Sequence, residues 1–300
     1  MNALEKELNQ KDFVKIDLEK EYEEALKNPV FKEIAKKTKL PKKELKNYTS
    51  LLEEVAAEYG HCLECKNIRE CQNRIRGHVY FPTVHQGHLD FEYKTCRYQE
   101  KLEKNTKYLK NIKYFNTPRT LQDASMESIY KNDKSRFEVI LWIGEFLKNY
   151  TEETNQKGLY LSGNFGCGKT YLVAALFNEL AKKGYQSAIL FWPEFLRQAF
   201  YDDFKEKYEY VKKVPLLLID DIGAENVTAW NRDEILCPLL QYRMEEGLTT
   251  FFTSNLSLND LEEHLASSKA GVESIKAGRI VSRIKQLTVP LEMISKNLRK

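Results

Sequence analysis

The chain has 300 residues, of which 42% are hydrophobic and 30% are charged, a composition typical of a globular protein. At roughly 100–200 residues per domain, this length predicts two domains and leaves room for a sizeable buried core. The formal net charge of +3 favours no class of partner, and no apolar run approaches the roughly 20 residues that cross a bilayer, so we expect a cytoplasmic protein without a membrane span.

Residues 1–60 are rich in charge and hold a single glycine, Gly60, which predicts surface helices. In the second of these helices, apolar residues recur at three- and four-residue steps and form one stripe: Leu45, Tyr48, Leu52, Val55, Ala56 and Tyr59. Such a stripe usually packs on neighbouring helices, and a helix that binds a partner is the alternative. We assign residues 1–100 to a mostly helical, zinc-binding domain.

Four of the six cysteines fall between Cys62 and Cys96, and clustered thiols in a chain without a secretion signal more often bind metal than form disulfides. Cys62 and Cys65 form a C-x2-C pair that can hold one side of a Zn²⁺ ion, and Cys96 is a distant third ligand. The fourth ligand is either His78 or Cys71. A redox C-x-x-C is the alternative, but no thioredoxin-like strand precedes the pair. The pattern predicts structural Zn²⁺ that supports the folding of this small region.

Residues 101–135 are expected to form a basic connector. A lysine stands at every third position of its first part, at Lys101, Lys104, Lys107, Lys110 and Lys113. Such a row is usually the solvated face of a helix, and the alternative is a face that follows a phosphate backbone.

From residue 136 to residue 300, helical and strand patterns alternate, which predicts an α/β ATPase domain. An amphipathic helix is expected over residues 135–150. The segments with the pattern of short apolar strands are Gly158–Ser162, Gln186–Trp192, Pro215–Asp220, Thr249–Ser254 and Gln286–Pro290. The run Leu216–Ile219 is apolar at every position, which suits a parallel sheet that is covered on both faces.

A phosphate-binding loop is predicted directly after the first of these strands. Residues 163–170 fit G-x-x-x-x-G-K-[ST] at every fixed position, and a helical pattern follows. In such a loop the backbone N–H groups surround the β-phosphate, Lys169 reaches the β- and γ-phosphates, and the Thr170 hydroxyl binds Mg²⁺. The residues expected to bind ATP or ADP are Gly163, Asn164, Phe165, Gly166, Cys167, Gly168, Lys169, Thr170, Tyr171 and Asp220.

Two aspartates end the third apolar strand. We assign Asp220 to Mg²⁺, together with Thr170, and Asp221 to polarising the attacking water. Two aspartates that only end a strand are the alternative, but the phosphate-binding loop argues against it. Because the second carboxylate of such pairs is more often Glu, the shorter Asp221 predicts slow hydrolysis.

Two further polar positions are candidates for catalysis. Asn255 follows the next strand, where an amide can bond the γ-phosphate or its water, although an Asn that only opens a turn is the alternative. Arg279 and Arg283 stand four residues apart on one helix face, so they either form surface ion pairs or reach a nucleotide held by an adjacent subunit. We favour Arg283 as this arginine finger. The expected catalytic residues are therefore Lys169, Asp221, Asn255 and Arg283.

Aromatic and basic residues are interleaved over residues 191–213. This pattern can stack bases and follow the phosphates of single-stranded DNA. An amphipathic helix packed on the sheet explains the same spacing, and it is the interpretation that we favour.

The C-terminal segments together resemble the bacterial replicative helicase loaders, the DnaI/DnaC branch of the AAA+ ATPases. The resemblance covers about residues 136–300 and is carried by residues 163–170, 216–225, 230–234, 253–255 and 278–284. It implies a five-stranded parallel sheet, homo-oligomers that form on ATP and DNA binding, contact with single-stranded DNA, and loading of the ring helicase during primosome assembly, in replication initiation and restart. Only about ten residues follow Pro290, so we expect no helical lid of the kind that many AAA+ proteins carry.

The upstream cysteines match the DnaI side of this branch. The resemblance implies a zinc site of three Cys and one His, which favours His78 over Cys71, in a domain that grips the helicase, with other primosome proteins as further partners. A transposon-type or initiator-type AAA+ DNA-binding ATPase is the alternative function, but it would not need the cysteine cluster. A zinc-bearing nucleic-acid-binding protein with a purely structural ATP site is a third, and the set of Asp220, Asp221 and Asn255 argues against it.

Overall fold

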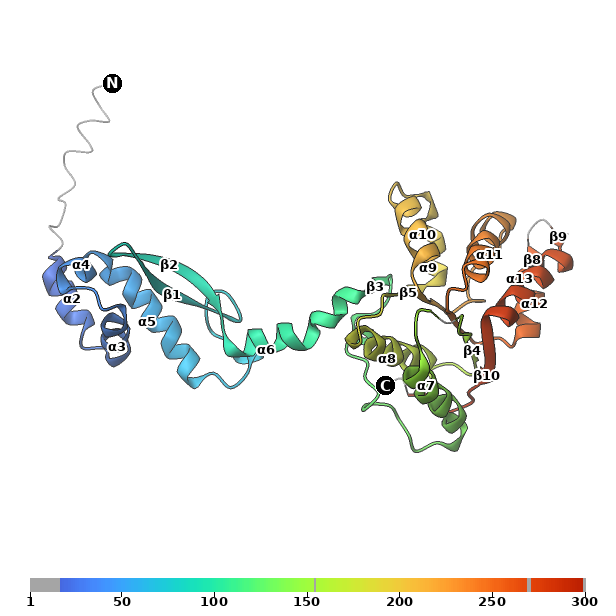
Figure 1. The fold of residues 1–300 in the computed structure, drawn as a ribbon, viewed down its shortest axis with the longest axis horizontal. Coiled ribbons are helices and arrows are strands. Elements are labelled where there is room, and N and C mark those ends of the chain that lie inside the picture. The colour runs from blue at the N-terminus through green and yellow to red at the C-terminus, as the bar shows by residue number, and fades with distance from the viewer. Residues whose placement is uncertain (1–16, 154, 269–270, 299–300) are drawn as a thin grey trace, which may run out of the picture. The chain divides into compact units, whose positions relative to one another are not determined.

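The computed structural model of the protein describes residues 17–153, 155–268 and 271–298, and the chain divides into two compact units, residues 1–106 and residues 107–300 (Figure 1). The first 16 residues of the expected N-terminal domain lie outside the described residues. None of the helices in the described part has the length and apolar composition that a bilayer crossing requires.

The first unit combines short helices with one β-hairpin. Its elements are α2 (Leu18–Ala25), α3 (Pro29–Thr38), α4 (Lys42–Leu45), η1 (Lys46–Tyr48), α5 (Thr49–Glu64), η2 (Ile68–Glu70), β1 (His78–His85), β2 (His88–Thr95) and α6 (Arg97–Thr106). The predicted apolar stripe lies in the core of this unit, because Leu52 and Val55 of α5 are fully buried in one cluster with Phe31 and Leu89. The stripe therefore packs on neighbouring elements.

The sequence patterns do not predict the hairpin. Its strands pair antiparallel from His78 with Thr95 to His85 with His88. Gln86 and Gly87 form the loop with φ values of 49° and 85°, and two left-handed residues are the requirement of a turn that matches the twist of both strands. Most side chains of the two strands are half-buried or exposed, so the alternation that identifies a strand in a sequence is weak.

The second unit is built on a parallel sheet that has six strands among the described residues, in the order β10-β4-β7-β6-β5-β3. The strands are β3 (Ile112–Phe115), β4 (Gly158–Ser162), β5 (Ser187–Phe191), β6 (Leu216–Asp220), β7 (Thr250–Ser254) and β10 (Thr288–Glu292). The prediction of five strands is wrong, because β3 pairs with β5 at the sheet edge. β3 is only four residues long and includes Lys113, the last residue of the lysine row, so the expected connector contains a strand that its composition conceals.

Helices cover both faces of this sheet (Figure 1). One core joins α7 (Phe137–Asn149) and α8 (Lys169–Lys182) to strand residues such as Leu216 and Leu218. The other joins the remaining helices to strand residues such as Leu217 and Ile219. Those helices are α9 (Trp192–Arg197), α10 (Phe204–Lys213), α11 (Cys237–Glu245), α12 (Leu258–Ala266) and α13 (Ser274–Leu287). Since successive strand residues face opposite cores, the continuously apolar strands are explained.

The shorter elements of this unit connect the main ones. They are η3 (Lys107–Asn111), η4 (Arg119–Leu121), η5 (Lys134–Arg136), η6 (Gln198–Phe200), the π-helical turn η7 (Asn231–Leu236), β8 (Ser267–Ser268) and β9 (Gly271–Val272).

A fully buried arginine on α11 fastens the amino ends of the central strands. Arg243 Nη1 donates to the backbone oxygens of Val211 and Val214 at 3.0 and 2.7 Å, and Nη2 donates to that of Thr249 at 2.8 Å. Its Nε donates to the Thr250 hydroxyl at 2.8 Å. Burial lowers the pKa of Arg243 to about 9, which leaves the guanidinium charged at neutral pH. The carboxyl ends of the strands, which lie opposite Arg243, carry the polar residues described next.

Candidate active site

The phosphate-binding loop joins the carboxyl end of β4 to the first turn of α8. Gly163, Gly166 and Gly168 have φ values of 150°, 72° and 89°, a region that residues with a Cβ rarely enter. At Gly163 a Cβ would also lie 2.0 Å from the backbone oxygen of Met293. The loop therefore needs glycine to bring its N–H groups together at the helix N-terminus, where the dipole favours an anion.

Lys169 opens α8, and its side chain folds over the loop. Nζ donates to the backbone oxygens of Gly163 and Asn164 at 2.8 and 2.9 Å and to Asn255 Oδ1 at 2.8 Å. The residue is only 8% exposed. Its positive charge therefore lies at the mouth of the loop, the place where P-loop nucleotidases bind the β- and γ-phosphates.

Asp220 ends β6, and its carboxylate accepts hydrogen bonds from two hydroxyl groups. Oδ1 accepts from Thr170 Oγ1 at 2.6 Å and from Thr253 Oγ1 at 2.5 Å. Burial raises the pKa of Asp220, and the two hydroxyl bonds act in the opposite direction because they favour the charged form. A carboxylate beside the threonine of the loop is the oxygen set that holds Mg²⁺ in P-loop nucleotidases. The predicted Mg²⁺ residues Thr170 and Asp220 thus lie together and fit the ion.

Asn255, just after β7, joins the lysine to the second aspartate. Its Oδ1 accepts from Lys169, and its Nδ2 donates to Asp221 Oδ1 at 3.0 Å. The Asp221 N–H in turn donates to the Thr253 hydroxyl at 3.0 Å. Asp221 has a φ of 60°, and this left-handed conformation turns the chain sharply after β6. The Asn255 amide therefore contacts both the group expected to bind phosphate and the group expected to polarise water.

Two of the predicted residues lie away from this cluster. Tyr171, in the first turn of α8, packs on the core, and its hydroxyl accepts from the Ser125 N–H at 3.4 Å. Arg283 lies on α13, where Nε donates to Gln241 Oε1 at 2.6 Å and Nη1 donates to Arg279 O at 2.9 Å. Both arginines line a groove between α11 and α13. Within one chain, Arg283 thus contacts its own helix and α11.

Two residues of the site escaped the sequence analysis as individual contributors. Thr253 lies two positions before Asn255, and its place at the end of a strand beside the aspartate strand was the available signal. Arg136 ends η5, is 1% exposed, and donates through Nη1 to the backbone oxygen of Cys167 in the loop. An arginine in front of an amphipathic helix has the pattern of a surface residue, so no sequence signal identifies it.

In the first unit, the clustered thiols line one cavity of about 340 Å³ together with His78. These thiols are Cys62, Cys65, Cys71 and Cys96. Across the described residues, no group of three or more His, Cys, Asp or Glu side chains is arranged to hold a metal ion. The predicted zinc ligands therefore share a cavity without forming a metal-binding arrangement.

Hydrogen bonds to the cysteine sulfurs and to His78 describe the surroundings of the predicted zinc ligands. Asn73 Nδ2 donates to Cys62 Sγ at 3.3 Å, and the Gly77 N–H donates to Cys71 Sγ at 3.4 Å. The His78 Nδ1 lies 3.1 Å from the Arg76 backbone oxygen, an arrangement that leaves Nε2 for a ligand. Burial raises the pKa of the Cys62 thiol.

The aromatic segment 191–213 divides between core and surface. Trp192, Phe195 and Leu196 of α9 are buried, as the favoured interpretation of a helix packed on the sheet predicts. Phe200 is 84% exposed, and its ring stacks on that of Trp230 with centroids 5.5 Å apart and planes at 19°. The exposed aromatic side chains of this region are therefore Phe200, Tyr201 and Trp230, and none of them belongs to α9.

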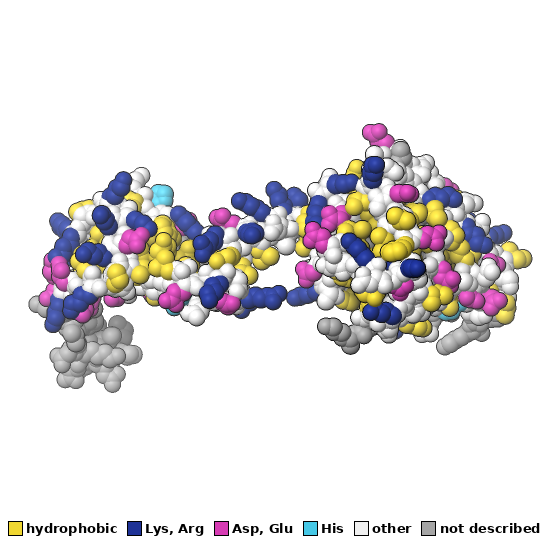
Figure 2. Space-filling model, turned by 90° about the horizontal axis from the view of Figure 1, so that it is seen from below, with side chains coloured by type: hydrophobic (Ala, Val, Ile, Leu, Met, Phe, Trp, Pro, Cys, Tyr) yellow, Lys and Arg dark blue, Asp and Glu magenta, His cyan; other side chains and the backbone are white. Residues whose placement is uncertain are grey.

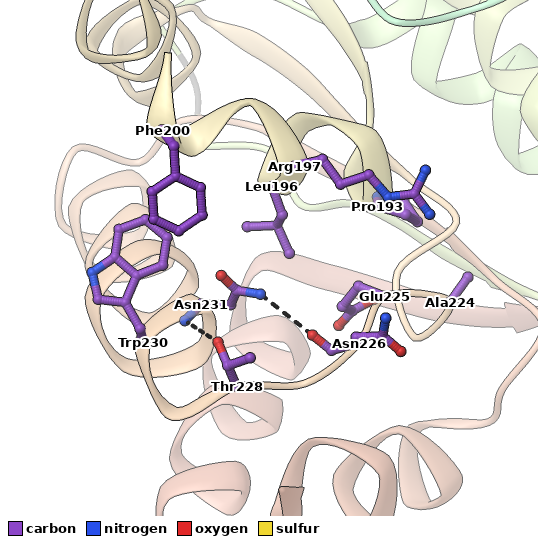
Figure 3. Close-up of a pocket in the computed structure, with 10 residues that line it drawn as sticks. All are labelled: Pro193, Leu196, Arg197, Phe200, Ala224, Glu225, Asn226, Thr228, Trp230 and Asn231. Atoms are coloured by element: carbon purple, nitrogen blue, oxygen red, sulfur yellow. Dashed lines mark hydrogen bonds between the residues drawn. The ribbon is translucent and has the colours of Figure 1, made fainter. Parts of the chain in front are cut away.

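This pair stands at one end of a cavity of about 500 Å³ (Figure 3). Arg197 lies toward the opposite end with Glu225 and Asn226 across from it, and Asn231 lies between the two ends. We call this cavity the aromatic slot. Its flat stacked rings and polar wall combine apolar area with hydrogen-bonding groups.

Replacement of Thr253 by Val should move the acid limb of the ATPase pH profile toward higher pH. The substitution removes a hydroxyl bond that lowers the pKa of Asp220, so a larger fraction of this carboxyl is protonated at a given pH, and the neutral acid binds Mg²⁺ poorly. Steady-state ATP hydrolysis measured across pH at saturating Mg²⁺ tests this.

Ser254→Ala is the matched control for Thr253→Val. Ser254 carries the adjacent hydroxyl, which donates to Ile222 O at 2.6 Å and not to Asp220. An unchanged acid limb in Thr253→Val, or an equal displacement in Ser254→Ala, would contradict the role given to the Thr253 hydroxyl.

Known proteins resemble this chain in sequence and in structure. The family model described as AFG1-like ATPase matches residues 93–267. The replicative helicase loader DnaI of Bacillus subtilis (strain 168) is 37% identical over 253 residues, which cover 83% of this chain and 81% of that protein. The crystal structure of DnaI matches with a TM-score of 0.59 and 42% identity, over 64% of this chain and 100% of that one. The crystal structure of the DnaC helicase loader, at 24% identity and a TM-score of 0.50, covers 59% and 99% and shows the fold alone.

These matches confirm the resemblance drawn from the motifs and the α/β fold with a parallel sheet. The match to DnaI extends into the first unit, because the second unit begins at Lys107 and holds less of the chain than the 83% that is aligned. The family model supports ATPase activity. The chain belongs to the AFG1-like ATPases and to the family of the replicative helicase loader DnaI.

Proposed function

We propose that the protein loads the replicative ring helicase onto single-stranded DNA during primosome assembly, in replication initiation and restart, with ATP as the switch. The observation that carries the proposal is the connected set of Lys169, Asp220, Asp221 and Asn255 in a chain that belongs to the DnaI family. A transposon-type or initiator-type ATPase is less favoured, because the aligned region includes part of the first unit.

The nucleotide site supports ATP hydrolysis by positioning and charge. Lys169 neutralises the β- and γ-phosphates, and Asp221 orients the attacking water. Mg²⁺ bound by Thr170 and Asp220 would offset the charge that develops on the phosphate oxygens. We propose slow turnover, because the Asp221 carboxylate is short and already accepts the Asn255 amide at 3.0 Å.

Self-assembly is proposed from the groove between α11 and α13. It is lined by Gln241, Ile275, Arg279 and Arg283 among others, and Ile275 is 78% exposed. An exposed apolar side chain beside two guanidinium groups suits a neighbouring subunit with bound nucleotide. In this arrangement Arg283, whose Nε donates to Gln241 in the single chain, reaches the γ-phosphate of the neighbour on ATP and DNA binding.

The first unit is proposed to grip the helicase and to hold Zn²⁺. Cys62, Cys65 and Cys96 supply three thiolates, and the contact between His78 Nδ1 and the Arg76 carbonyl supports His78 as the fourth ligand. All six cysteines of the chain are unpaired, which supports a reducing, cytoplasmic location.

Contact with single-stranded DNA is proposed at the aromatic slot. Phe200 and Trp230 offer a surface on which a base can stack, and Arg197 can bind a phosphate. On the face shown in Figure 2, basic and acidic side chains are interspersed over each unit, so the contact is local. In the second unit, the exposed Lys107, Lys110 and Lys113 are a second place where a phosphate backbone can bind. Other primosome proteins are proposed as further partners on the ground of family membership.

Capture on the purified, immobilised ring helicase tests the proposed function. The full chain should be retained, and residues 107–300 alone should pass through, because the gripping surface lies on the first unit. The Lys169→Ala variant is the control, since it damages the nucleotide site and leaves the first unit intact. Equal retention of residues 107–300 and the full chain would contradict the assignment of the grip.

Zinc content of purified chains tests the metal proposal. The His78→Asn variant should lose its stoichiometric Zn²⁺, and the Cys71→Ser variant should keep it, when measured by elemental mass spectrometry. His85→Asn is the matched control, because His85 is an exposed histidine at the far end of β1. The reverse pattern would make Cys71 the fourth ligand, and a wild-type chain purified without zinc would refute the site.

Substitution of the slot aromatics should weaken binding to single-stranded DNA. Loss of one stacked base costs about 1–3 kcal/mol, so Phe200→Ala and Trp230→Ala should each raise the Kd of a labelled oligothymidylate, measured by fluorescence anisotropy with ATP. Phe137→Ala on α7 removes another half-exposed phenylalanine and should have little effect. Equal losses in all three variants, or binding that ignores salt, would argue against the slot.

A further inference from the structure

The segment that follows β10, residues 293–298, runs beside the phosphate-binding loop. The Met293 N–H donates to Ser162 O at 2.8 Å, and the Leu298 N–H donates to Gly166 O at 2.8 Å. The first bond continues the pairing of β10 with β4 beyond the last strand residue. The segment therefore follows the loop as a neighbouring strand would.

Between these two bonds, the side chain of Asn164 pairs with the backbone of Ser295. Asn164 Nδ2 donates to Ser295 O at 2.7 Å, and Asn164 Oδ1 accepts from the Ser295 N–H at 3.0 Å. Asn164 stands at a variable position of the loop motif, so nucleotide chemistry does not require an amide there. Its two bonds instead serve the contact with residues 293–298.

A second tie comes from the residues that precede α7. Ser295 Oγ donates to Asp133 Oδ2 at 2.6 Å, and Arg136 donates to the backbone oxygen of Cys167. Within the part of the chain that the structure describes, the buried Arg136 Nε has no hydrogen-bond partner. Residues 133–136, the loop and residues 293–298 are thus joined in a closed ring of contacts.

These contacts bear on nucleotide binding through the backbone of the loop. When the loop N–H groups turn inward to phosphate, some of its carbonyls point outward and need donors. Leu298 supplies one for Gly166, and Arg136 supplies one for Cys167. A glycine-rich loop loses much backbone entropy when it is ordered. Contacts that order the loop before nucleotide binds reduce the entropy cost of nucleotide binding.

We propose that residues 293–298 form a strap that holds the phosphate-binding loop in its nucleotide-binding form, with Asn164 and Ser295 as positioning residues, so that strap seating and nucleotide binding favour each other. Coupling of this kind is reciprocal: if the strap increases affinity for ATP, ATP must stabilise the strap by the same factor. This proposal depends on nucleotide binding at the loop and does not depend on helicase loading.

Hydrogen exchange on the full wild-type chain tests the coupling without any substitution. Saturating ATP with Mg²⁺ should slow exchange at the N–H groups of Met293, Ser295 and Leu298 by about fivefold or more. Exchange that is unchanged, or faster with ATP, would overturn the proposal, since faster exchange means that nucleotide displaces the strap.

Substitution provides the reciprocal measurement. Asn164→Ala removes both bonds to Ser295 and should raise the Kd for ATP by about 5- to 20-fold, and ATP should then no longer protect residues 293–298. Ile294→Ala is the matched control within the strap, because Ile294 is 62% exposed, and its Kd should stay within about twofold of wild type.

Wild-type affinity in Asn164→Ala, or an equal loss in Ile294→Ala, would overturn the role of Asn164. Every variant keeps the first unit unchanged, so capture on the helicase should persist in each. Loss of capture by the wild-type chain would refute the proposed function while leaving the exchange and Kd measurements fully decisive for the strap.

Discussion

The hydrogen bonds on the Asp220 carboxylate set the geometry of the nucleotide site. Asp220 Oδ1 accepts one hydrogen bond from the Thr170 hydroxyl on α8 and another from the Thr253 hydroxyl on β7, while Asp220 itself ends β6. Burial disfavours its charge and raises its pKa, and the two hydroxyl groups partly offset that cost. The contact holds only if β4, β7 and β6 are neighbours and end at the same edge, which the parallel order of the sheet ensures.

The other polar groups of the site follow directly after the carboxyl ends of these strands. Asp221 follows Asp220 in a left-handed conformation, and Asn255 follows β7, so the Asn255 amide bridges Asp221 and Lys169. A movement of Lys169 is therefore transmitted through Asn255 to Asp221, the residue proposed to orient water. The same lysine contacts the carbonyl of Asn164, whose side chain is bonded to Ser295. The site and the segment after β10 thus share one network.

Buried guanidinium groups bond irregular backbone at both the amino and the carboxyl ends of the strands. Arg243 satisfies carbonyls where strands begin, and Arg136 satisfies one in the phosphate-binding loop. A planar group with five N–H donors can bond several carbonyls at once, including those of irregular backbone. Backbone that departs from regular structure near the site is in this way kept ordered without further secondary structure.

Local pattern was sufficient for the phosphate-binding loop, for the strands β4 to β7 and β10, and for the aspartates and Asn255, because each depends on residues a few positions apart or on the end of a buried strand. It was insufficient for β3, whose four residues form a strand only through pairing with β5, and for the hairpin, whose side chains are mostly half-exposed. Asn164 and Ser295 are separated by 131 positions, and Arg136 precedes Cys167 by 31. Such contacts follow from which strands lie side by side, a property of the assembled sheet that no window along the chain contains.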